Sequence, residues 1–300
     1  MPDMPTAEKI KPGLFDLSDW GGVFIEGPDA ADYLNRMSTA DIKKLGVNGV
    51  SHAAFLTGRG LVVALGMLER ATSERFFFWH SHGQTEKLLA HLEMFHFAEK
   101  ITFSDMSSST ALLGFWRQEP FPGVCEMKVS SGEWNDVSMS AWREDARHQF
   151  IWGKMDRLVY EEIRSQVPWL PLSDYEYLRL EAGIPEVGKE AGESDIILET
   201  GFDRSVARNK GCYPGQEVVE RIFTYGSVNR KLLRVSWEGE LPPLPAEFEV
   251  DGKTAGRWVS VAVEPGQKDR GVGLAYVQKN FWEYAKGVKV GGATLHWKNL

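Results

Sequence analysis

Residues 208–221 read RNKGCYPGQEVVER. Cys212 is one of two cysteines in the chain, and glycines flank it at Gly211 and Gly215. The stretch also carries lysine and arginine, and cations near a thiol favour its thiolate, the form that attacks electrophiles and binds metals. Glycine permits backbone angles that other residues resist and lets a ligand approach the main chain. The stretch is therefore typical of a functional thiol loop. The alternative is a glycine-rich turn whose cysteine packs as a small apolar side chain.

Three blocks of the chain carry a family resemblance. The octapeptide Lys210–Glu217 resembles the K-G-C-[YF]-x-G-Q-E signature of the YgfZ family, folate-binding proteins implicated in the assembly or repair of iron–sulphur clusters. Residues 178–190, LRLEAGIPEVGKE, resemble a stretch shared by that family and the T-protein of the glycine cleavage system, an aminomethyltransferase. A weaker match lies within residues 27–41. Together the blocks span most of the chain in the expected order.

The resemblance implies an α+β fold in which three modules form a ring around a central folate cavity. It predicts a folate-binding body over residues 1–225, made of two α+β modules that split near 105–110 and that this fold allows to be discontinuous. A small C-terminal β-barrel follows over residues 226–300. The sequence supports the barrel independently, because short strands separated by turn residues fit such a fold.

The resemblance also implies a folate site. In T-proteins the glutamate of the second block holds the pterin ring, which gives that role to Glu181. An ionised carboxylate accepts two hydrogen bonds and matches the adjacent N–H donors on the pterin edge. Lys210 and Arg221 are expected at the anionic glutamate tail of folate or beside Cys212, and the alternative is a solvated charged face.

The rest of the octapeptide is less decisive. Gln216 and Glu217 are candidates for the folate site, or they anchor the loop through backbone hydrogen bonds. Gly211, Tyr213 and Gly215 complete the motif loop, in which Tyr213 either packs or touches the ligand.

One departure from the T-protein pattern concerns chemistry. T-proteins carry an aspartate on the second strand of the first hairpin, where it assists aminomethyl transfer, whereas residues 60–65 here read GLVVAL. General acid–base help is therefore missing from its expected place, and glycine cleavage activity is not expected. Cys212 is the catalytic candidate instead, as a transient iron or sulphur ligand or as a thiolate that attacks a folate-borne one-carbon unit. The sequence leaves both roles open.

The function predicted from these features is a tetrahydrofolate-binding accessory protein for the assembly or repair of iron–sulphur clusters in client enzymes. Its ligand is tetrahydrofolate or a one-carbon derivative, and its partners are client or assembly proteins. The alternative is a folate-dependent methyl or aminomethyl transferase. A third possibility is a scaffold that has kept the fold and lost the ligand.

Composition narrows the classes of function. The 300 residues carry a net charge of −8 and no basic stripe, which argues against nucleic-acid binding. No apolar run approaches the ~20 residues that span a bilayer, and the N-terminus lacks a signal-peptide pattern, so a cytoplasmic location is expected. Two cysteines, Cys125 and Cys212, cannot form a four-cysteine site, and the histidines lack a third ligand. No stably bound metal is expected.

Periodicity and turn residues predict the local elements. Residues 118–135 are expected to form a loop. A helix is expected to begin at Asp174, with Ser173 as its cap and Glu176 as the capping-box partner, and to end at Gly183. The other helices are predicted over 84–98 and 155–165. Strands are predicted over 50–57, 61–68, 75–80, 101–105, 110–116, 149–153, 231–237, 248–250, 253–255, 259–263, 272–277, 288–290 and 294–297.

Overall fold

The computed structural model describes residues 10–11, 13–116, 130–134, 137–143, 150–284 and 286–297, and Cys125 lies outside them. The chain divides into two compact units. The N-terminal body comprises Lys11–Leu170 and Arg204–Gln216, and the C-terminal unit comprises Pro171–Asp203 and Glu217–Leu300 together with the start of the chain. Compact units need not coincide with the modules of a fold family. The division into 1–225 and 226–300 therefore stays a prediction.

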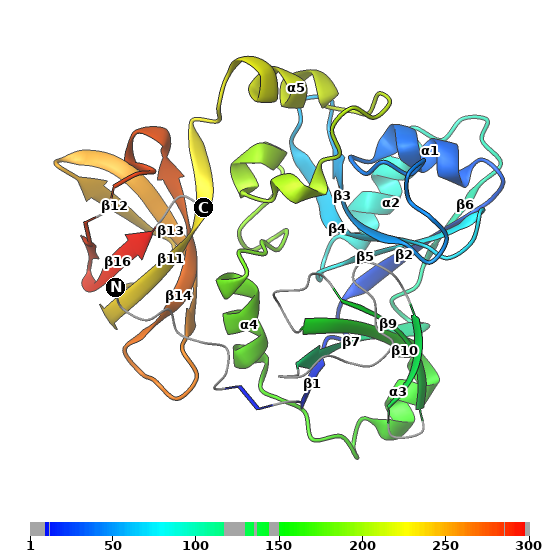
Figure 1. Cartoon of the computed structure of the whole chain (residues 1–300), viewed down its shortest axis with the longest axis horizontal. Coiled ribbons are helices and arrows are strands. Elements are labelled where there is room, and N and C mark those ends of the chain that lie inside the picture. Colours follow the sequence, from blue (N-terminus) through cyan, green and yellow to red (C-terminus); the bar gives the residue numbers. More distant parts are fainter. Residues whose placement is uncertain are drawn as a thin grey trace. The chain divides into compact units, whose positions relative to one another are not determined.

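The N-terminal body contains, among its described residues, two antiparallel five-stranded sheets (Figure 1). The first sheet has the order β3-β4-β5-β2-β6, and the second has the order β1-β7-β10-β9-β8. The strands of the first sheet are β2 (Gly21–Glu26), β3 (Val50–Leu56), β4 (Val62–Arg70), β5 (Arg75–His80) and β6 (Thr102–Asp105). Those of the second are β1 (Gly13–Asp16), β7 (Thr110–Trp116), β8 (Ser130–Trp134), β9 (Val137–Arg143) and β10 (Phe150–Asp156).

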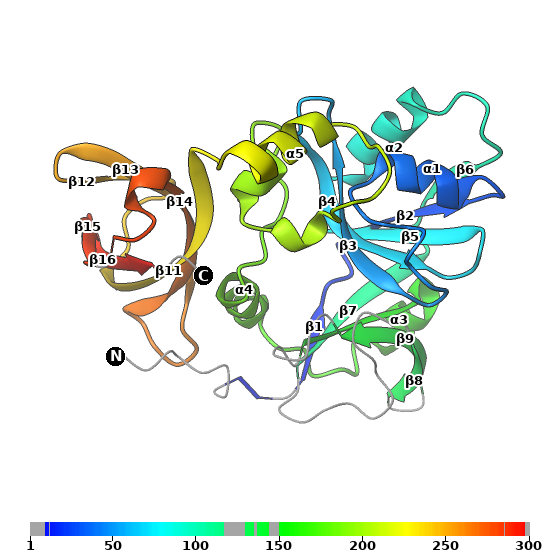
Figure 2. The ribbon, with the colours of Figure 1, turned by 45° about the horizontal axis from the view of Figure 1, so that its top comes forward.

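The aromatic strand β5 shows how one sequence serves both of its faces. Side chains alternate between the faces of a strand, and Phe76 and Phe78 enter the core that the first sheet shares with helices α1 (Ala30–Met37) and α2 (Thr85–Met94). On the other face, Phe77 and Trp79 stack with centroids 5.5 Å apart, and the Lys154 ammonium of β10 lies over both rings. Figure 2 shows α1 and α2 beside this sheet.

A buried ion pair accompanies these aromatic rings. The Lys154 ammonium lies 2.6 Å from both carboxylate oxygens of Glu69 on β4, and the indole N–H of Trp79 donates to the same carboxylate at 3.0 Å. The side chain of Lys154 is 14% exposed and that of Glu69 is 3% exposed. Burial lowers the pKa of Lys154, while the Glu69 carboxylate acts in the opposite direction. The pair therefore joins the two sheets of the body at a nearly dry position.

The C-terminal unit contains, in its described part, six strands in the order β12-β13-β14-β11-β16-β15. The end strands β12 and β15 contact each other, so the sheet is a nearly closed barrel, as predicted. Its core includes the aromatic side chains of Trp237, Phe248, Trp258 and Trp297. The strands are β11 (Arg230–Glu240), β12 (Ala246–Val250), β13 (Lys253–Val263), β14 (Arg270–Gln278), β15 (Val288–Val290) and β16 (Gly292–Trp297).

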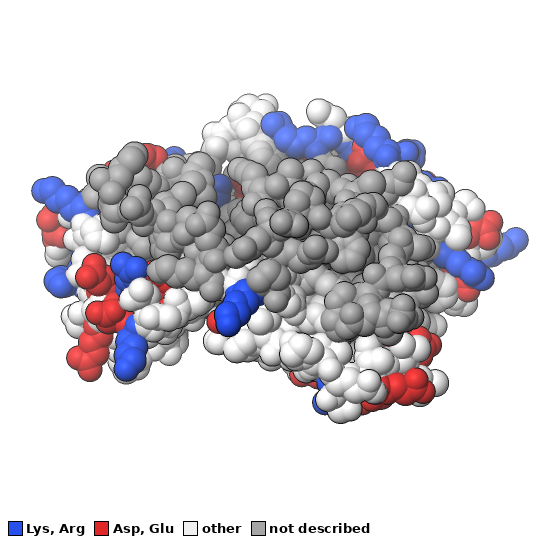
Figure 3. Space-filling view, turned by 60° about the horizontal axis from the view of Figure 1, so that its bottom comes forward, with Lys and Arg blue, Asp and Glu red and all other residues white. Residues whose placement is uncertain are grey.

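Helix α4 (Leu172–Glu181) packs against β13 and β14 of this barrel. Short 3₁₀ turns follow at Ile197–Thr200, Asp203–Ser205 and Lys279–Phe281, and the remaining helices are α3 (Arg157–Ile163) and α5 (Gln216–Tyr225). No helix among the described residues is long and apolar enough to cross a bilayer. Acidic and basic side chains are interspersed over the described part of the face in Figure 3.

Several predicted elements need correction. Helix α2 ends at Met94 rather than residue 98, because the Glu99 carboxylate accepts the N–H groups of Phe97 and Ala98. Residues 130–134 form a strand within the predicted 118–135 loop, and residues 117–129 and 135 lie outside the described part. The strands predicted over 253–255 and 259–263 are one strand, β13, which continues through a register shift.

The start of α4 also differs from the prediction. The helix begins at Leu172 after Pro171, and Ser173 does not cap it. Glu176 does not form a capping box, because its carboxylate pairs with Arg179 and Lys189 instead. The predicted end is confirmed: Gly183 has a φ of +67°, the left-handed conformation that terminates helices.

Candidate functional site

The loop that carries Cys212 is bound to the N-terminal body through Thr39. The Thr39 hydroxyl donates to the carbonyl of Ser205 and accepts the N–H of Ala54 at 2.8 Å. The Thr39 carbonyl accepts the N–H of Ala207 at 2.9 Å. One side chain and its own backbone thus hold the start of the loop against β3. Thr39 lies in the weakly matching block 27–41, but nothing in the sequence pairs it with Ser205.

Lys210 fixes the middle of the loop. Its ammonium donates to the carbonyls of Ser38 at 2.5 Å and Ala40 at 2.6 Å, and it lies 5.1 Å from the centroid of the Tyr213 ring. Burial lowers the pKa of Lys210 to about 8, against the opposite effect of Asp41. The side chain is therefore mostly charged at neutral pH. An ammonium has three N–H donors, and the two carbonyls leave one for a further acceptor.

Gly215 fixes the end of the loop. Its φ is +82°, and a Cβ atom added there would lie 2.7 Å from the Cα of Gly60 and from the carbonyl oxygen of Thr57. Because these are backbone atoms of the β3–β4 hairpin, only glycine fits this approach. The turn predicted at residues 57–60 is confirmed and serves as the seat for the loop.

Cys212 lies between these fixed points and is exposed. Gly211 is also exposed, whereas Tyr213 is buried. The interpretation of Cys212 as a packed apolar side chain is therefore wrong. The described residues contain no cluster of three His, Cys, Asp or Glu side chains that could hold a metal ion. The expected absence of a stable metal site stays a prediction.

The last two residues of the octapeptide, Gln216 and Glu217, are helical. Helix α5 begins at Gln216, which is half-buried, and Val219 is its buried apolar residue. Glu217 and Arg221 form an exposed ion pair at 3.2 Å, one helical turn apart. Their spacing could have revealed the helix, since opposite charges four residues apart are typical of a solvated helix face.

Glu181 is the last residue of α4 in the C-terminal unit and is half-buried. Its backbone carbonyl accepts a hydrogen bond from Arg234 of β11 at 3.4 Å. One turn earlier, the Tyr177 hydroxyl is buried and has no hydrogen-bond partner in the described part of the chain. Burial raises the pKa of Tyr177, and the carboxylates of Glu181 and Glu264 raise it further. The Glu181 carboxylate therefore lies near a buried hydroxyl that has no hydrogen-bond partner among the described residues.

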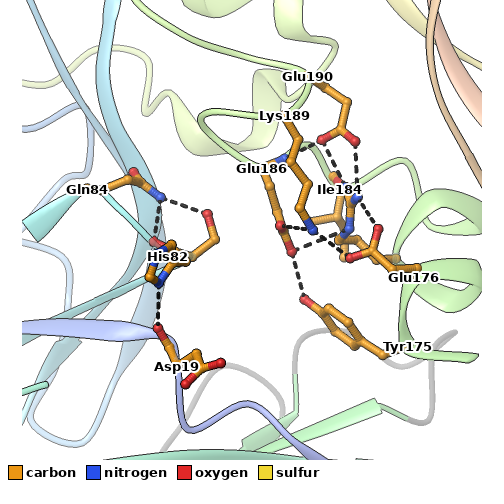
Figure 4. A network of polar contacts seen from close by, with 11 residues as sticks. Asp19, His82, Gln84, Tyr175, Glu176, Ile184, Glu186, Lys189 and Glu190 are labelled. Atoms are coloured by element: carbon orange, nitrogen blue, oxygen red, sulfur yellow. Dashed lines mark hydrogen bonds and ion pairs between the residues drawn. The ribbon is translucent and has the colours of Figure 1, made fainter. Parts of the chain in front are cut away.

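Arg179, two residues before Glu181, belongs to a charged network whose other members include Glu176, Glu186, Lys189 and Glu190, labelled in Figure 4. The guanidinium forms two hydrogen bonds of 3.0 Å to the two oxygens of Glu190 and another to Glu176. Lys189 adds contacts of 2.7 Å to Glu176 and 2.8 Å to Glu186. Burial opposes the charge of Arg179, but the nearby carboxylates, Glu190 first, raise its pKa. The sequence singled out this block as a motif but not these pairings.

A separate cluster in the N-terminal body surrounds the start of α2 (Figure 4). The Gln84 side chain accepts the N–H of Leu65 at 2.9 Å and donates to Ser81. The pairing of β4 with β5 ends at Gly66 and His80, and the Gln84 side chain then accepts the N–H of the next β4 residue, Leu65. Gln84 thereby holds Leu65, which lies in the segment 60–65 where the resemblance to T-proteins would place an aspartate.

The fold agrees with comparisons to known proteins. Residues 7–116 match the family described as the GCVT N-terminal domain. The structure is similar to the glycine cleavage system aminomethyltransferase T of Bartonella henselae, with a TM-score of 0.80 and 19% identity over 98% of this chain and 87% of that one. The fold is therefore that of the T-proteins.

The curated relatives of the chain carry two kinds of name. The chain is 28% identical to an aminomethyltransferase of Rubrobacter xylanophilus over 90% of this chain and 77% of the relative. It is 24% identical to the mitochondrial iron–sulfur cluster assembly factor IBA57 homolog of Dictyostelium discoideum, over 78% of this chain and 65% of that protein. These similarities show that the chain resembles T-protein-like proteins over most of its length. The narrower YgfZ family, the ring of modules and the central cavity stay predictions.

Proposed function

We propose that this protein binds a reduced folate and uses the Cys212 thiol in the assembly or repair of iron–sulphur clusters in client enzymes. The observation that carries the proposal is the exposure of Cys212 on a loop fixed by Thr39, Lys210 and Gly215. A buried sulphur could not reach a client or a cluster. The similarity to an iron–sulfur cluster assembly factor supports the same reading.

The donors and acceptors present fit a folate. Glu181 offers a half-buried carboxylate for the paired N–H donors of a pterin, beside a Tyr177 hydroxyl that lacks a partner among the described residues. Lys210 keeps one N–H, and Arg221 is exposed, so both suit the carboxylates of the glutamate tail. Gln216 and Glu217 begin α5 directly after the cysteine loop and remain candidates for the folate site or for anchoring the loop. Bound folate would supply a one-carbon carrier.

Replacement of Cys212 by alanine is expected to abolish function in cells. A strain that lacks this protein should lose activity of iron–sulphur enzymes, and the wild type should restore it while Cys212→Ala leaves it at the level of the deletion strain. The assay compares client activity per amount of client protein. Cys125→Ala makes the same chemical change at the other cysteine and should restore activity fully. Full restoration by Cys212→Ala would reject a thiol-based role.

Replacement of Glu181 by glutamine is expected to weaken tetrahydrofolate binding by roughly 10- to 150-fold, since a charge-assisted hydrogen bond is worth ~1.5–3 kcal/mol. Isothermal titration of purified protein with tetrahydrofolate measures this directly. Glu161→Gln is the matched control, because Glu161 is a partly exposed ion-pair partner on α3. Equal affinities for the wild type and Glu181→Gln would remove Glu181 from the site.

The second candidate is a folate-dependent one-carbon transferase, which the similarity to curated aminomethyltransferases favours. Residues 60–65 contain no carboxylate to assist aminomethyl transfer. A thiolate at Cys212 would then have to act on the one-carbon unit. Formation of a folate adduct by purified protein and a candidate donor, with turnover, distinguishes this activity from the accessory role.

Cytoplasmic location stays a prediction.

A further inference from the structure

Arg179 joins the end of α4 to the loop that follows it. Its side chain is 1% exposed, and both terminal nitrogens of the guanidinium bind Glu190 at 3.0 Å, one to each carboxylate oxygen. One of those nitrogens also donates to the carbonyl of Ile184 at 2.9 Å. Planar two-bond pairing of this kind fixes geometry as well as charge.

Glu190 in turn organises the rest of the loop. Its carboxylate accepts the N–H of Glu186 at 2.8 Å. Its backbone carbonyl accepts the hydroxyl of Tyr276 on β14 at 3.0 Å. Residues 184–190 are thus tied both to α4 and to the barrel, and Glu190 takes part in each connection.

Glu181 lies between Arg179 and this loop. The chain leaves the helix at Ala182, turns at Gly183 and returns so that the N–H of Ile184 donates to the Arg179 carbonyl at 3.0 Å. Helix ends fray when nothing holds them. A carboxylate that must meet two donors at once needs its position held to within about 0.5 Å. The bonds of Arg179 to Glu190 and Ile184 therefore prevent fraying of the last turn of α4, which carries the Glu181 side chain.

We propose that Arg179 and Glu190 are positioning residues for the Glu181 carboxylate and set its selectivity for heterocycles with two adjacent N–H donors. The inference rests on the proposed function, because it concerns the same ligand. Neither residue needs to touch the ligand. Their effect is to hold Glu181 where both of its oxygens are used, rather than one.

The test compares tetrahydrofolate with its 2-desamino analogue, in which hydrogen replaces the 2-amino group and one of the two donors is lost. The wild type should prefer tetrahydrofolate by roughly 10- to 150-fold, the value of one charge-assisted hydrogen bond. Glu190→Gln keeps the size of the side chain and an acceptor for Glu186 while it removes the charge. Its preference should fall to within about threefold of that of Glu181→Gln. Titrations are run below the unfolding transition of each variant.

Two further variants separate positioning from stability. In Glu181→Gln/Glu190→Gln the preference should equal that of Glu181→Gln alone, because Glu190 acts only through Glu181. Arg179→Lys keeps the positive charge but cannot form the bidentate pair with Glu190. Its preference for tetrahydrofolate over the 2-desamino analogue should therefore fall as it does in Glu190→Gln. Glu161→Gln should keep the wild-type preference.

The outcomes distinguish the two ideas. If Glu190→Gln loses affinity for both ligands equally and keeps the preference, its role is only structural and the inference is overturned. A further loss of preference in the double variant would overturn it as well, since Glu190 would then act without Glu181. If the wild type shows no preference, or Glu181→Gln retains it, the proposed role of Glu181 fails first and the positioning inference fails with it.

Discussion

The Lys154→Met variant is expected to lose about 3–5 kcal/mol of unfolding free energy, the usual cost of leaving one member of a buried ion pair alone. Glu69 is 3% exposed, and without the Lys154 ammonium the Trp79 indole is the one hydrogen-bond donor to its carboxylate that remains among the described residues. The methionine side chain suits the space over the Phe77 and Trp79 rings, so loss of packing contributes little. Chemical denaturation at pH 7 measures the difference.

The matched control also removes the Glu69 charge that Lys154→Met leaves unpaired. In Lys154→Met/Glu69→Gln, no buried carboxylate is left unpaired, and glutamine still accepts from Trp79. Most of the lost stability should return, because replacing both members of a buried pair is often neutral. A double variant as unstable as Lys154→Met would show that the ammonium stabilises through the aromatic rings rather than through Glu69.

Acid is expected to remove about 3 kcal/mol of stability through His80 as the pH falls from 6.5 to 4. Burial lowers the pKa of His80 from 6.5 to about 4, although the Ser81 carbonyl and Asp105 act in the opposite direction. The unfolded chain therefore takes up the proton before the folded protein does. The contribution is fully present above pH 6.5 and is lost progressively as the pH falls from 6.5 to 4, by at most ~1.4 kcal/mol per pH unit.

Substitution of His80 isolates this effect. His80→Gln has no titrating ring, so its unfolding free energy should fall less steeply between pH 6.5 and 4 than that of the wild type. His82→Gln changes an exposed histidine two residues away and should keep the wild-type slope. Identical slopes for the wild type and His80→Gln would contradict the assignment.

The sequence revealed those parts of the fold that depend on neighbours along the chain. The run Arg75–His80 is a strand at the predicted bounds, and the hairpin at Asp251 and Gly252 forms with positive φ at both residues. Strand β2 was not predicted, because it starts with Gly21 and Gly22. A Cβ atom at Gly21 would lie 2.3 Å from the His80 ring, and one at Gly22 would lie 2.5 Å from the Trp79 ring. Glycine is therefore required at both positions by aromatic rings that lie far away in the sequence.

The same limit applies to the candidate site. Cys212 and Glu181 could be proposed from the sequence because each lies in a motif with distinctive residue types. Their supports were not, since Thr39 meets Ser205 and Lys210 meets Ser38 only after more than 160 intervening residues have folded. Arg179 and Glu190 are closer in sequence. Several glutamates lie near Arg179, however, and the sequence does not show which of them forms the bidentate pair with its guanidinium.

Residues 204–216, the strap that carries Cys212, have a consequence for biosynthesis. It completes a body whose other residues, 11–170, leave the ribosome earlier, and a segment of the other unit is translated in between. The nascent body must therefore wait with Thr39 and the Thr57–Gly60 turn uncovered until the strap emerges. Any product that terminates before residue 204 therefore lacks both this segment and Cys212.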